Sequence, residues 1–256
     1  MPWHKAGCKF FGALGSILIG TIYAAPHLIR YRCKDTDMQA TRHNPEFSPK
    51  GQQLLDLYNQ MADTGYMTSS GHKIEAAYND FELVKFKQAV SEQFRKYEIK
   101  SVLDYGCGGS DWENQQIFNG QSAKKYFDLD HIYRYEPARG IDERVMADAV
   151  VCFDVMEHIF ISDVPNVLRD ILSCASTLAV INVACYRAAA LLPNGENAHI
   201  TQRPPHWWKG MVDAVSIEFP HVSVFLLCST AYNNADAFPV FCDAVRQADP
   251  CFEVGY

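Results

Sequence analysis

An apolar strand that runs into a turn rich in glycine is the stretch of this chain best suited to bind a ligand. Its residues are Val102-Leu103-Asp104-Tyr105-Gly106-Cys107-Gly108-Gly109-Ser110. Glycine has no Cβ, so the turn can be tight and a ligand can approach its peptide groups closely. We expect Ser110 to Glu113 to open a helix whose free N–H groups face that ligand. The pattern predicts a ligand-binding loop at the end of a strand.

The acidic residue before the glycines narrows the class of ligand. A carboxylate at this strand end would repel a pyrophosphate, so Asp104 disfavours a dinucleotide. Position 111, where a G-x-G-x-x-G loop has its third glycine, is aspartate, which also speaks against a nicotinamide dehydrogenase. A ligand with a positive group suits Asp104. S-adenosylmethionine, which carries an ammonium and a sulfonium, is such a ligand.

Two more acidic residues follow predicted strands and could complete the same site. Glu136 closes the second strand, where a carboxylate can accept hydrogen bonds from both hydroxyls of a ribose. Asp154 follows a continuous apolar run over 149–153 and would form one wall of the same crevice. Each acid also has a plainer interpretation. The segment 135–137 alone is typical of a surface turn, and the residues after Asp154 can pair locally around the next helix.

These acids can meet only if their strands lie side by side in one sheet. From residue 99 onward, apolar runs alternate with amphipathic segments, which is typical of β-α-β units. The predicted strands are 99–104, 131–136, 149–153, 178–184 and 222–228, and the predicted helices are 111–119, one that begins near 163 and one that begins at 205. The expected fold class is α/β, a Rossmann-like and mostly parallel sheet with helices on both faces. Ligands of such sheets bind beyond the carboxyl ends of the strands, near the switch point.

The chain before this sheet divides into two parts. Residues 1–34 carry five Lys or Arg and no Asp or Glu, and residues 10–25 form an apolar run without charge. This head is interpreted as a leader or upstream extension, a membrane-associating segment, or a cleaved secretion signal. Residues 35–98 are predicted to be a linker and a helical extension, with helices over 52–62 and 73–97. The remaining residues, 99–256, form the predicted Rossmann-like domain.

Composition limits the partners and the compartment. Of the 256 residues 48% are apolar, so a large core can form, and the formal charge of −7 argues against a broad nucleic-acid surface. The nine cysteines are odd in number and contain no C-x-x-C pair, which favours buried thiols in a reducing compartment over disulfides. We expect no metal centre and no nucleic-acid partner. The predicted location is the cytoplasm, with possible membrane contact through residues 10–25.

The three acidic blocks together resemble the class I S-adenosylmethionine-dependent methyltransferases. The matching segments are Leu103-Asp104-Tyr105-Gly106-Cys107-Gly108, Tyr135-Glu136-Pro137 and Asp154-Val155-Met156-Glu157-His158-Ile159. The order of the motifs makes the resemblance more specific than any one of them. It implies that Gly106 and Gly108 line the methionine end of the cofactor and that Asp104 meets its amino group. It further implies that Glu136 holds the ribose and that Asp154 belongs to the cofactor pocket.

A later segment resembles a narrower group. The run Leu192-Pro193-Asn194-Gly195-Glu196-Asn197-Ala198-His199-Ile200 precedes a helix with tryptophans and is similar to the "LPDGRNAHL" segment of a bacterial and phage subgroup. On this polar loop His199 is the predicted catalytic base for an oxygen acceptor. The alternative is a loop histidine that only makes a structural hydrogen bond to the backbone. His206 and Trp207 could shape the acceptor pocket.

Two departures from the family pattern limit what the resemblance implies. Only 11 residues separate Glu136 from Asp148, where the common pattern has a helix and a third strand. Either that strand is missing or the segment, which would lie beside the adenine, is compressed. The chain also lacks the Asn/Asp-Pro-Pro-Tyr/Phe motif, which speaks against an enzyme that methylates amino groups of the DNA-adenine kind.

The resemblance implies an enzyme that uses S-adenosylmethionine to methylate a small-molecule, glycan or lipid-linked acceptor. Such a reaction depends mainly on positioning, because the sulfonium is already a good leaving group. The alternative is a non-catalytic S-adenosylmethionine-binding protein or a membrane-tethered interaction protein with the same fold. Transfer of a labelled methyl group would distinguish the two.

Overall fold

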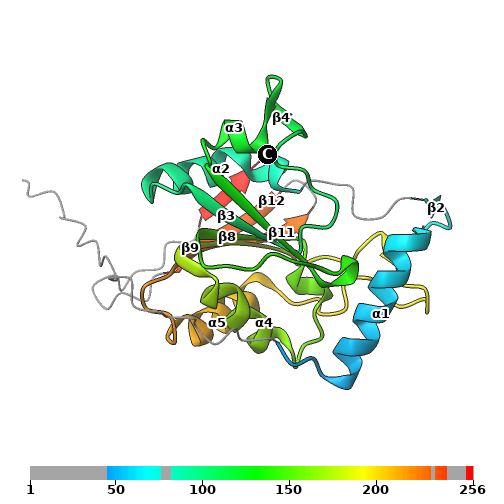
Figure 1. Ribbon diagram of the computed structural model, residues 1–256. Coiled ribbons are helices and arrows are strands. Elements are labelled where there is room, and N and C mark those ends of the chain that lie inside the picture. The colour runs from blue at the N-terminus through cyan, green and yellow to red at the C-terminus, as the bar shows by residue number, and fades with distance from the viewer. Residues whose placement is uncertain (1–44, 76–81, 232–233, 241–251, 256) are drawn as a thin grey trace, which may run out of the picture. The chain divides into compact units, whose positions relative to one another are not determined.

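The computed structural model describes residues 45–75, 82–231, 234–240 and 252–255 (Figure 1). The predictions for the head, residues 1–34 with the apolar run 10–25, lie outside these ranges. None of the helices in the described part of the chain is both long and apolar enough to cross a membrane. The described residues belong to one compact unit.

An eight-stranded sheet forms the centre of this unit. Its strands are β3 (Ser101–Tyr105), β6 (His131–Glu136), β7 (Ile141–Asp142), β8 (Ala147–Phe153), β9 (Ala175–Ala184), β11 (Ser223–Ala231), β12 (Asn234–Val240) and β13 (Phe252–Gly255). Their spatial order is β13-β12-β11-β9-β8-β3-β6-β7. The inner strands β6, β3, β8, β9 and β11 are mutually parallel, whereas β7, β12 and β13 pair antiparallel at the edges. The predicted α/β class with a mostly parallel sheet is confirmed.

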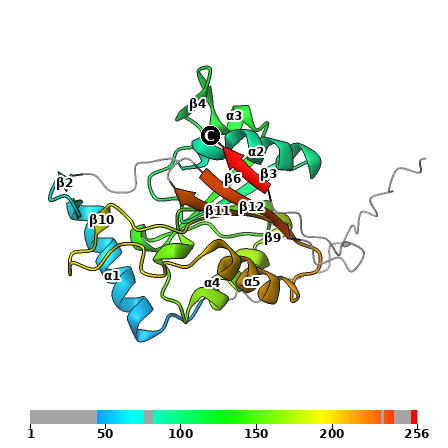
Figure 2. The ribbon, with the colours of Figure 1, turned by 180° about the vertical axis from the view of Figure 1, so that it is seen from behind.

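Helices cover both faces of the sheet, as expected. The helices α2 (Leu83–Lys96) and α3 (Ala123–Tyr126) lie on one face, and α4 (Val164–Ser173) and α5 (Pro205–Ser216) lie on the other (Figures 1 and 2). Side chains alternate along each strand, so Val150 and Cys152 pack with α4 and α5, whereas Ala149 and Val151 pack with α2. The strands are therefore buried on both sides, which explains their continuous apolar runs.

The strand order places a binding crevice between β3 and β8. Counted along the chain, the five parallel strands lie in the order second, first, third, fourth, fifth. In this arrangement the connections leave the first and third strands in opposite directions, and ligands bind at the carboxyl ends of these two strands. Asp104 lies near the end of β3, and Asp154 directly follows β8.

The short segment between β6 and β8 contains no helix of the α type. A single 3₁₀ turn, η1 (Pro137–Arg139), leads into β7, which returns antiparallel beside β6 with Tyr135 opposite Asp142. The connection to β8 is then an extended loop. The compressed alternative for this segment is therefore the one that the structure adopts.

The helix expected over 73–97 is wrong in its first part. Residues Lys73–Ile74 form β2, which pairs with β1 (Tyr66–Thr68), and β1 also pairs with β10 (Ala190–Leu191). The turn between β1 and β2 contains Gly71 with φ of +84°, a conformation that favours glycine and reverses the chain. The helix itself begins at Leu83. Residues 76–81 lie outside the described ranges.

The helix expected over 111–119, and with it the helix N-terminus at Ser110 to Glu113, is also wrong. The Asp111 carboxylate accepts the N–H groups of Glu113 and Asn114, and this turn leads into a hairpin of β4 (Gln116–Phe118) and β5 (Gln121–Ser122). At the hairpin tip Asn119 and Gly120 have φ of 47° and 74°. Asn-Gly with two positive φ angles is the usual tip of a two-residue hairpin. This local signal outweighs the helical spacing of the segment.

The helix α1 (Pro49–Thr64) confirms the helix predicted over 52–62 and extends it at both ends. It starts earlier because the Ser48 side chain accepts the N–H of Gly51, and a proline at the first helical position suits this start. Its buried face, which includes Tyr58, packs against Leu192 and Ala198 of the loop after β10. This packing brings α1 to the carboxyl ends of the strands.

Candidate functional site

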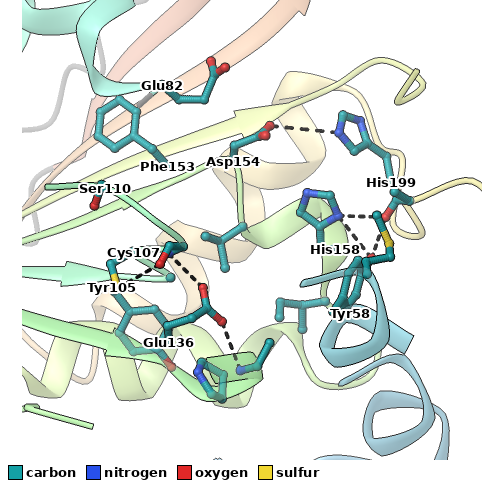
Figure 3. Close-up of a pocket in the computed structure, with 18 of the residues that line it drawn as sticks. Tyr58, Glu82, Tyr105, Cys107, Ser110, Glu136, Phe153, Asp154, His158 and His199 are labelled. Atoms are coloured by element: carbon teal, nitrogen blue, oxygen red, sulfur yellow. Dashed lines mark hydrogen bonds and ion pairs between the residues drawn. The ribbon is translucent and has the colours of Figure 1, made fainter. Parts of the chain in front are cut away.

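A cavity of about 380 Å³ lies at the carboxyl ends of β3, β6 and β8 (Figure 3). Its size is typical of small-molecule sites. All the site residues predicted from the sequence line it, namely Asp104, Gly106, Gly108, Glu136, Asp154 and His199. The fold therefore brings together side chains that lie up to 95 positions apart in the chain.

The glycine turn after β3 is held tightly against its neighbours. Gly106 has φ of +78°, and a Cβ there would lie 2.3 Å from Cγ2 of Val155. The N–H groups of Gly106 and Cys107 both donate to the Tyr135 carbonyl, at 2.7 and 3.1 Å. Gly106 is thus required for its backbone conformation and for the close approach of the loop after β8.

Asp104 is a buried acid that faces the cavity. It is 6% exposed, and its Oδ2 accepts hydrogen bonds from the Ser110 hydroxyl and from Nε1 of Trp112, the latter at 2.7 Å. Burial raises the pKa of Asp104 to about 6, although the two donors oppose this shift. Both hydrogen bonds end on Oδ2, so Oδ1 is left for a ligand. A buried carboxylate of this kind favours a cationic ligand group.

Glu136 ties the glycine turn to the end of β6. Its Oε2 accepts the N–H of Gly108 at 3.0 Å, and its Oε1 accepts the N–H of Ala138 at 3.1 Å. Burial raises the pKa of Glu136 above its ordinary value, and these backbone donors oppose the shift. Each carboxylate oxygen can accept a second hydrogen bond, so hydroxyl donors of a ligand could still bind.

Asp154 lies at the end of β8 in a strained backbone conformation. Its φ is +56°, which is uncommon for a residue with a Cβ and frequent at functional sites. Its side chain is 40% exposed and its Oδ1 lies 4.0 Å from Nε2 of His199. The carboxylate thus points across the cavity toward the imidazole (Figure 3).

Two imidazoles lie beside Asp154 with their orientation fixed by the backbone. Nδ1 of His199 lies 2.5 Å from the Tyr186 carbonyl oxygen, and Nδ1 of His158 lies 2.8 Å from the Ala198 carbonyl oxygen. A carbonyl oxygen can only accept, so each Nδ1 carries the proton and each Nε2 carries a lone pair. Burial and the neighbouring His199 lower the pKa of His158 to about 4, so this ring is neutral at pH 7.

Glu157 is a fully buried acid next to Asp154. Its Oε1 accepts the N–H of Ala184, whereas its Oε2 is buried with no hydrogen-bond partner among the described residues. Burial, followed by the charge of Asp154, raises the pKa of Glu157 well above its ordinary value. A cation near these two acids would oppose this shift.

Several residues of the site were not predicted from the sequence. Tyr58 of α1 donates to the Ala198 carbonyl at 2.6 Å and lies 3.1 Å from Nδ1 of His158. In the sequence Tyr58 is one residue of an apolar helical stripe, and nothing local indicates a polar role. Trp112 likewise reaches Asp104 only because residues 111–115 form a turn rather than a helix.

His206 and Trp207, which could have shaped an acceptor pocket, lie on α5 and do not line the cavity. Trp208 is 1% exposed and packs in the core, and Trp207 is partly buried against the same cluster. Both tryptophans thus pack on the core side of α5. The helix that carries them supports the sheet and leaves the cavity to other elements.

The cavity has two chemically distinct parts. One is the glycine turn with the carboxylates of Asp104 and Glu136, and the other is the carboxylate of Asp154 with His158 and His199. A scan against protein-family models and a search of the curated proteins find no match to this chain. The function is therefore argued from the cavity itself.

Proposed function

We propose that this chain is an S-adenosylmethionine-dependent methyltransferase that acts on a small-molecule, glycan or lipid-linked acceptor. The observation that carries the proposal is the position of Asp104 and Glu136. The two acids flank a glycine turn with positive φ, in one cavity at the switch point of a parallel sheet. A cationic, nucleoside-containing ligand fits this set of groups.

The cofactor would use the two acids at opposite ends. Its ammonium would bind the carboxylate of Asp104, and its ribose hydroxyls would donate to Glu136. The turn at Gly106 and Gly108, which lines the cavity, would contact the methionine part through its peptide groups. These roles are the ones that the resemblance to class I methyltransferases implies.

The acceptor would occupy the part of the cavity beside Asp154. In the metal-free protein, Nε2 of His199 has a free lone pair on the cavity side and is the group best placed to accept a hydroxyl proton. The hydrogen bond to the Tyr186 carbonyl holds this tautomer. The methyl group would then move from the sulfonium to the acceptor oxygen, and the sulfur would leave as a neutral thioether.

Calorimetric titration with S-adenosylmethionine and with its demethylated product tests the cofactor site. We expect one molecule per chain, and we expect Asp104→Asn to weaken binding at least about tenfold because it removes a charge-assisted contact. Glu136→Gln should also weaken it. The control is Asp130→Asn, an exposed acid in the loop before β6, which should bind as the unmodified protein does. Absence of heat with both ligands would contradict the proposal.

A second candidate is a cofactor-binding protein without catalysis. The short connection between β6 and β8 favours it, because this segment supplies only a 3₁₀ turn and a two-residue strand beside the expected adenine. Incubation with labelled cofactor and fractionated lysate separates the candidates. Labelled product that disappears with Asp104→Asn supports the enzyme, whereas binding without any labelled product supports the second candidate.

A further inference from the structure

We propose that Asp154, His158 and His199 bind one divalent metal ion. A carboxylate oxygen and one ring nitrogen from each histidine all lie within 4.8 Å of one another. Two imidazoles and a carboxylate are a ligand set that Zn²⁺, Mn²⁺ and Fe²⁺ accept. No local pattern indicates this site, because 41 positions separate the two histidines and no short metal-binding motif is present.

The backbone presents both imidazoles in the form that a metal requires. Each Nδ1–H donates to a carbonyl oxygen, of Ala198 or of Tyr186, so each Nε2 carries its lone pair away from the backbone. Metal-bound histidines commonly use such a carbonyl to fix the tautomer and the ring orientation. In His158 the Tyr58 hydroxyl, 3.1 Å from Nδ1, adds a second polar contact on the same side.

The ligand atoms, which lie within 4.8 Å of one another, would move closer together by up to about 1.8 Å to hold an ion. The rings of His158 and His199 meet edge to face with centroids 5.1 Å apart, and His158 lies beside the line from Asp154 to His199 (Figure 3). Bonds of about 2.1 Å to each ligand place neighbouring ligand atoms about 3.0 to 3.4 Å apart. The separation of 4.0 Å between Oδ1 of Asp154 and Nε2 of His199 would close by less than about 1 Å.

Glu157 gives an independent reason for a cation at this place. Its buried Oε2 has no hydrogen-bond partner among the described residues, and Glu157 precedes the proposed ligand His158 in the chain. A buried polar atom without a partner is uncommon and calls for an explanation such as an ion. An ion held by Asp154 would offset the negative charge of both acids. The strained φ of Asp154 fits the same interpretation, since it directs the carboxylate into the cavity.

The ion would change how the acceptor is activated, and this part of the inference rests on the proposed methyltransferase function. A bound ion occupies the Nε2 lone pair of His199, so His199 becomes a ligand and cannot accept a proton. In its place, the ion would lower the pKa of a hydroxyl that binds to it, the hydroxyl proton would pass to water, and the oxygen would take the methyl group as the sulfur leaves as a thioether. The acceptor class that suits such a site is an alcohol or a phenol, including the hydroxyl of a sugar.

The test is metal titration of the full chain after treatment with a chelator, in the absence of S-adenosylmethionine. Calorimetry with ZnCl₂ and MnCl₂ should show one saturable ion per chain, and Co²⁺ should give the visible absorption of a site with imidazole ligands. We expect His158→Ala, His199→Ala and Asp154→Asn each to weaken binding at least about tenfold, because even partners outside the ligand set cost 10- to 100-fold. Asp154→Asn preserves the size of a half-exposed side chain and so guards against a variant that fails to fold.

His131→Ala is the matched control. His131 is exposed at the start of β6, at the opposite end of the sheet, and its loss should leave metal affinity unchanged. Equal affinity in the unmodified protein and in all three site variants would overturn the proposal, as would the absence of saturable binding. Because the metal is titrated without the cofactor, and the cofactor can be titrated with chelator present, failure of one proposal is distinguishable from failure of the other.

Discussion

At the scale of single residues, Asp104 is the most deeply buried of the acids that line the cavity, and burial shifts its pKa strongly. Its pKa is raised to about 6 in the folded chain, against an ordinary value of 3.8. Between these two values the folded protein holds a proton that the unfolded chain has lost, so stability falls as the pH rises through this window. The shift corresponds to about 3 kcal/mol between pH 4 and pH 7.

Asp104→Asn should therefore change the pH profile of stability. Its amide has no proton to lose, so the variant should gain stability relative to the unmodified protein as the pH rises from 4 to 7, by up to about 3 kcal/mol. Urea unfolding of both proteins at pH 4.5, 5.5 and 7 measures this difference. Asp130→Asn, the exposed control, should follow the unmodified protein. A constant difference across the range would show that Asp104 titrates normally.

The glycine turn supplies a second prediction at this scale. Gly106→Ala should destabilise the fold by at least about 2 kcal/mol, because it adds a left-handed strain of about 1 to 2 kcal/mol to a clash with Val155. Gly140→Ala is the matched control, since Gly140 also has a positive φ (+66°) but open space around its Cβ. Gly140→Ala should lower the free energy of unfolding only by the left-handed strain of about 1 to 2 kcal/mol. Thermal unfolding should show a larger loss of stability for Gly106→Ala than for Gly140→Ala. Val155→Ala, combined with Gly106→Ala, should restore part of the lost stability because it removes the clash.

The cavity acids were predictable from the sequence because each follows an apolar strand, and parallel strands end at the same edge of a sheet. Tyr58, Trp112 and the polar role of His158 were not, each for a different reason. Tyr58 comes from a helix whose docking depends on the loop at Leu192 and Ala198. Trp112 depends on a turn in place of a helix, and the polar role of His158 depends on a histidine far away in the chain.

At the scale of elements, runs buried on both faces were the easiest to predict. The strand 131–136 agrees with β6 at both ends, and 149–153 lies within β8. Both wrong helices, by contrast, border on a glycine with positive φ that closes a hairpin or a turn. Gly71 closes the turn between β1 and β2, and Gly120 lies at the tip of the hairpin of β4 and β5. In such segments the turn signal outweighs helical periodicity.

The connection between β6 and β8 shows what the sequence left undecided at this scale. Its length indicated a missing or compressed wall, and the structure has a 3₁₀ turn and the short strand β7. No local pattern could reveal how so short a segment is anchored. The anchor is Arg144, whose side chain is 6% exposed and reaches across to a helix on one face of the sheet.

At the scale of the whole molecule, the Arg144 network joins three parts of the fold. Nη1 of Arg144 lies 2.8 Å from Oδ2 of Asp170 in α4, and the hydroxyl of Tyr105 in β3 donates to the same oxygen at 2.6 Å. The guanidinium also lies over the ring of Tyr135 in β6, 4.2 Å from its centroid. The network therefore fixes the positions of the short connection, the central strands and α4 relative to one another.

Arg144→Met should be among the most damaging single changes in this part of the chain. It leaves the Asp170 carboxylate, 2% exposed, without its cation, and removal of one partner of a buried pair costs about 3 to 5 kcal/mol. Arg169→Met is the control, because Arg169 lies on α4, the helix that carries Asp170. Its pair with Glu218 is exposed, so its loss should cost less than about 1 kcal/mol in urea unfolding at pH 7.

The double variant Arg144→Met/Asp170→Asn identifies the cause of the loss. An asparagine has no charge to bury and can still accept the hydrogen bond from Tyr105, so the double variant should be more stable than Arg144→Met alone. If the double variant is as unstable as the single one, the loss comes from the packing of Arg144 over Tyr135 rather than from an unpaired carboxylate. A weakened anchor should also lower affinity for the proposed cofactor, because the connection begins directly after Glu136 at the cavity edge.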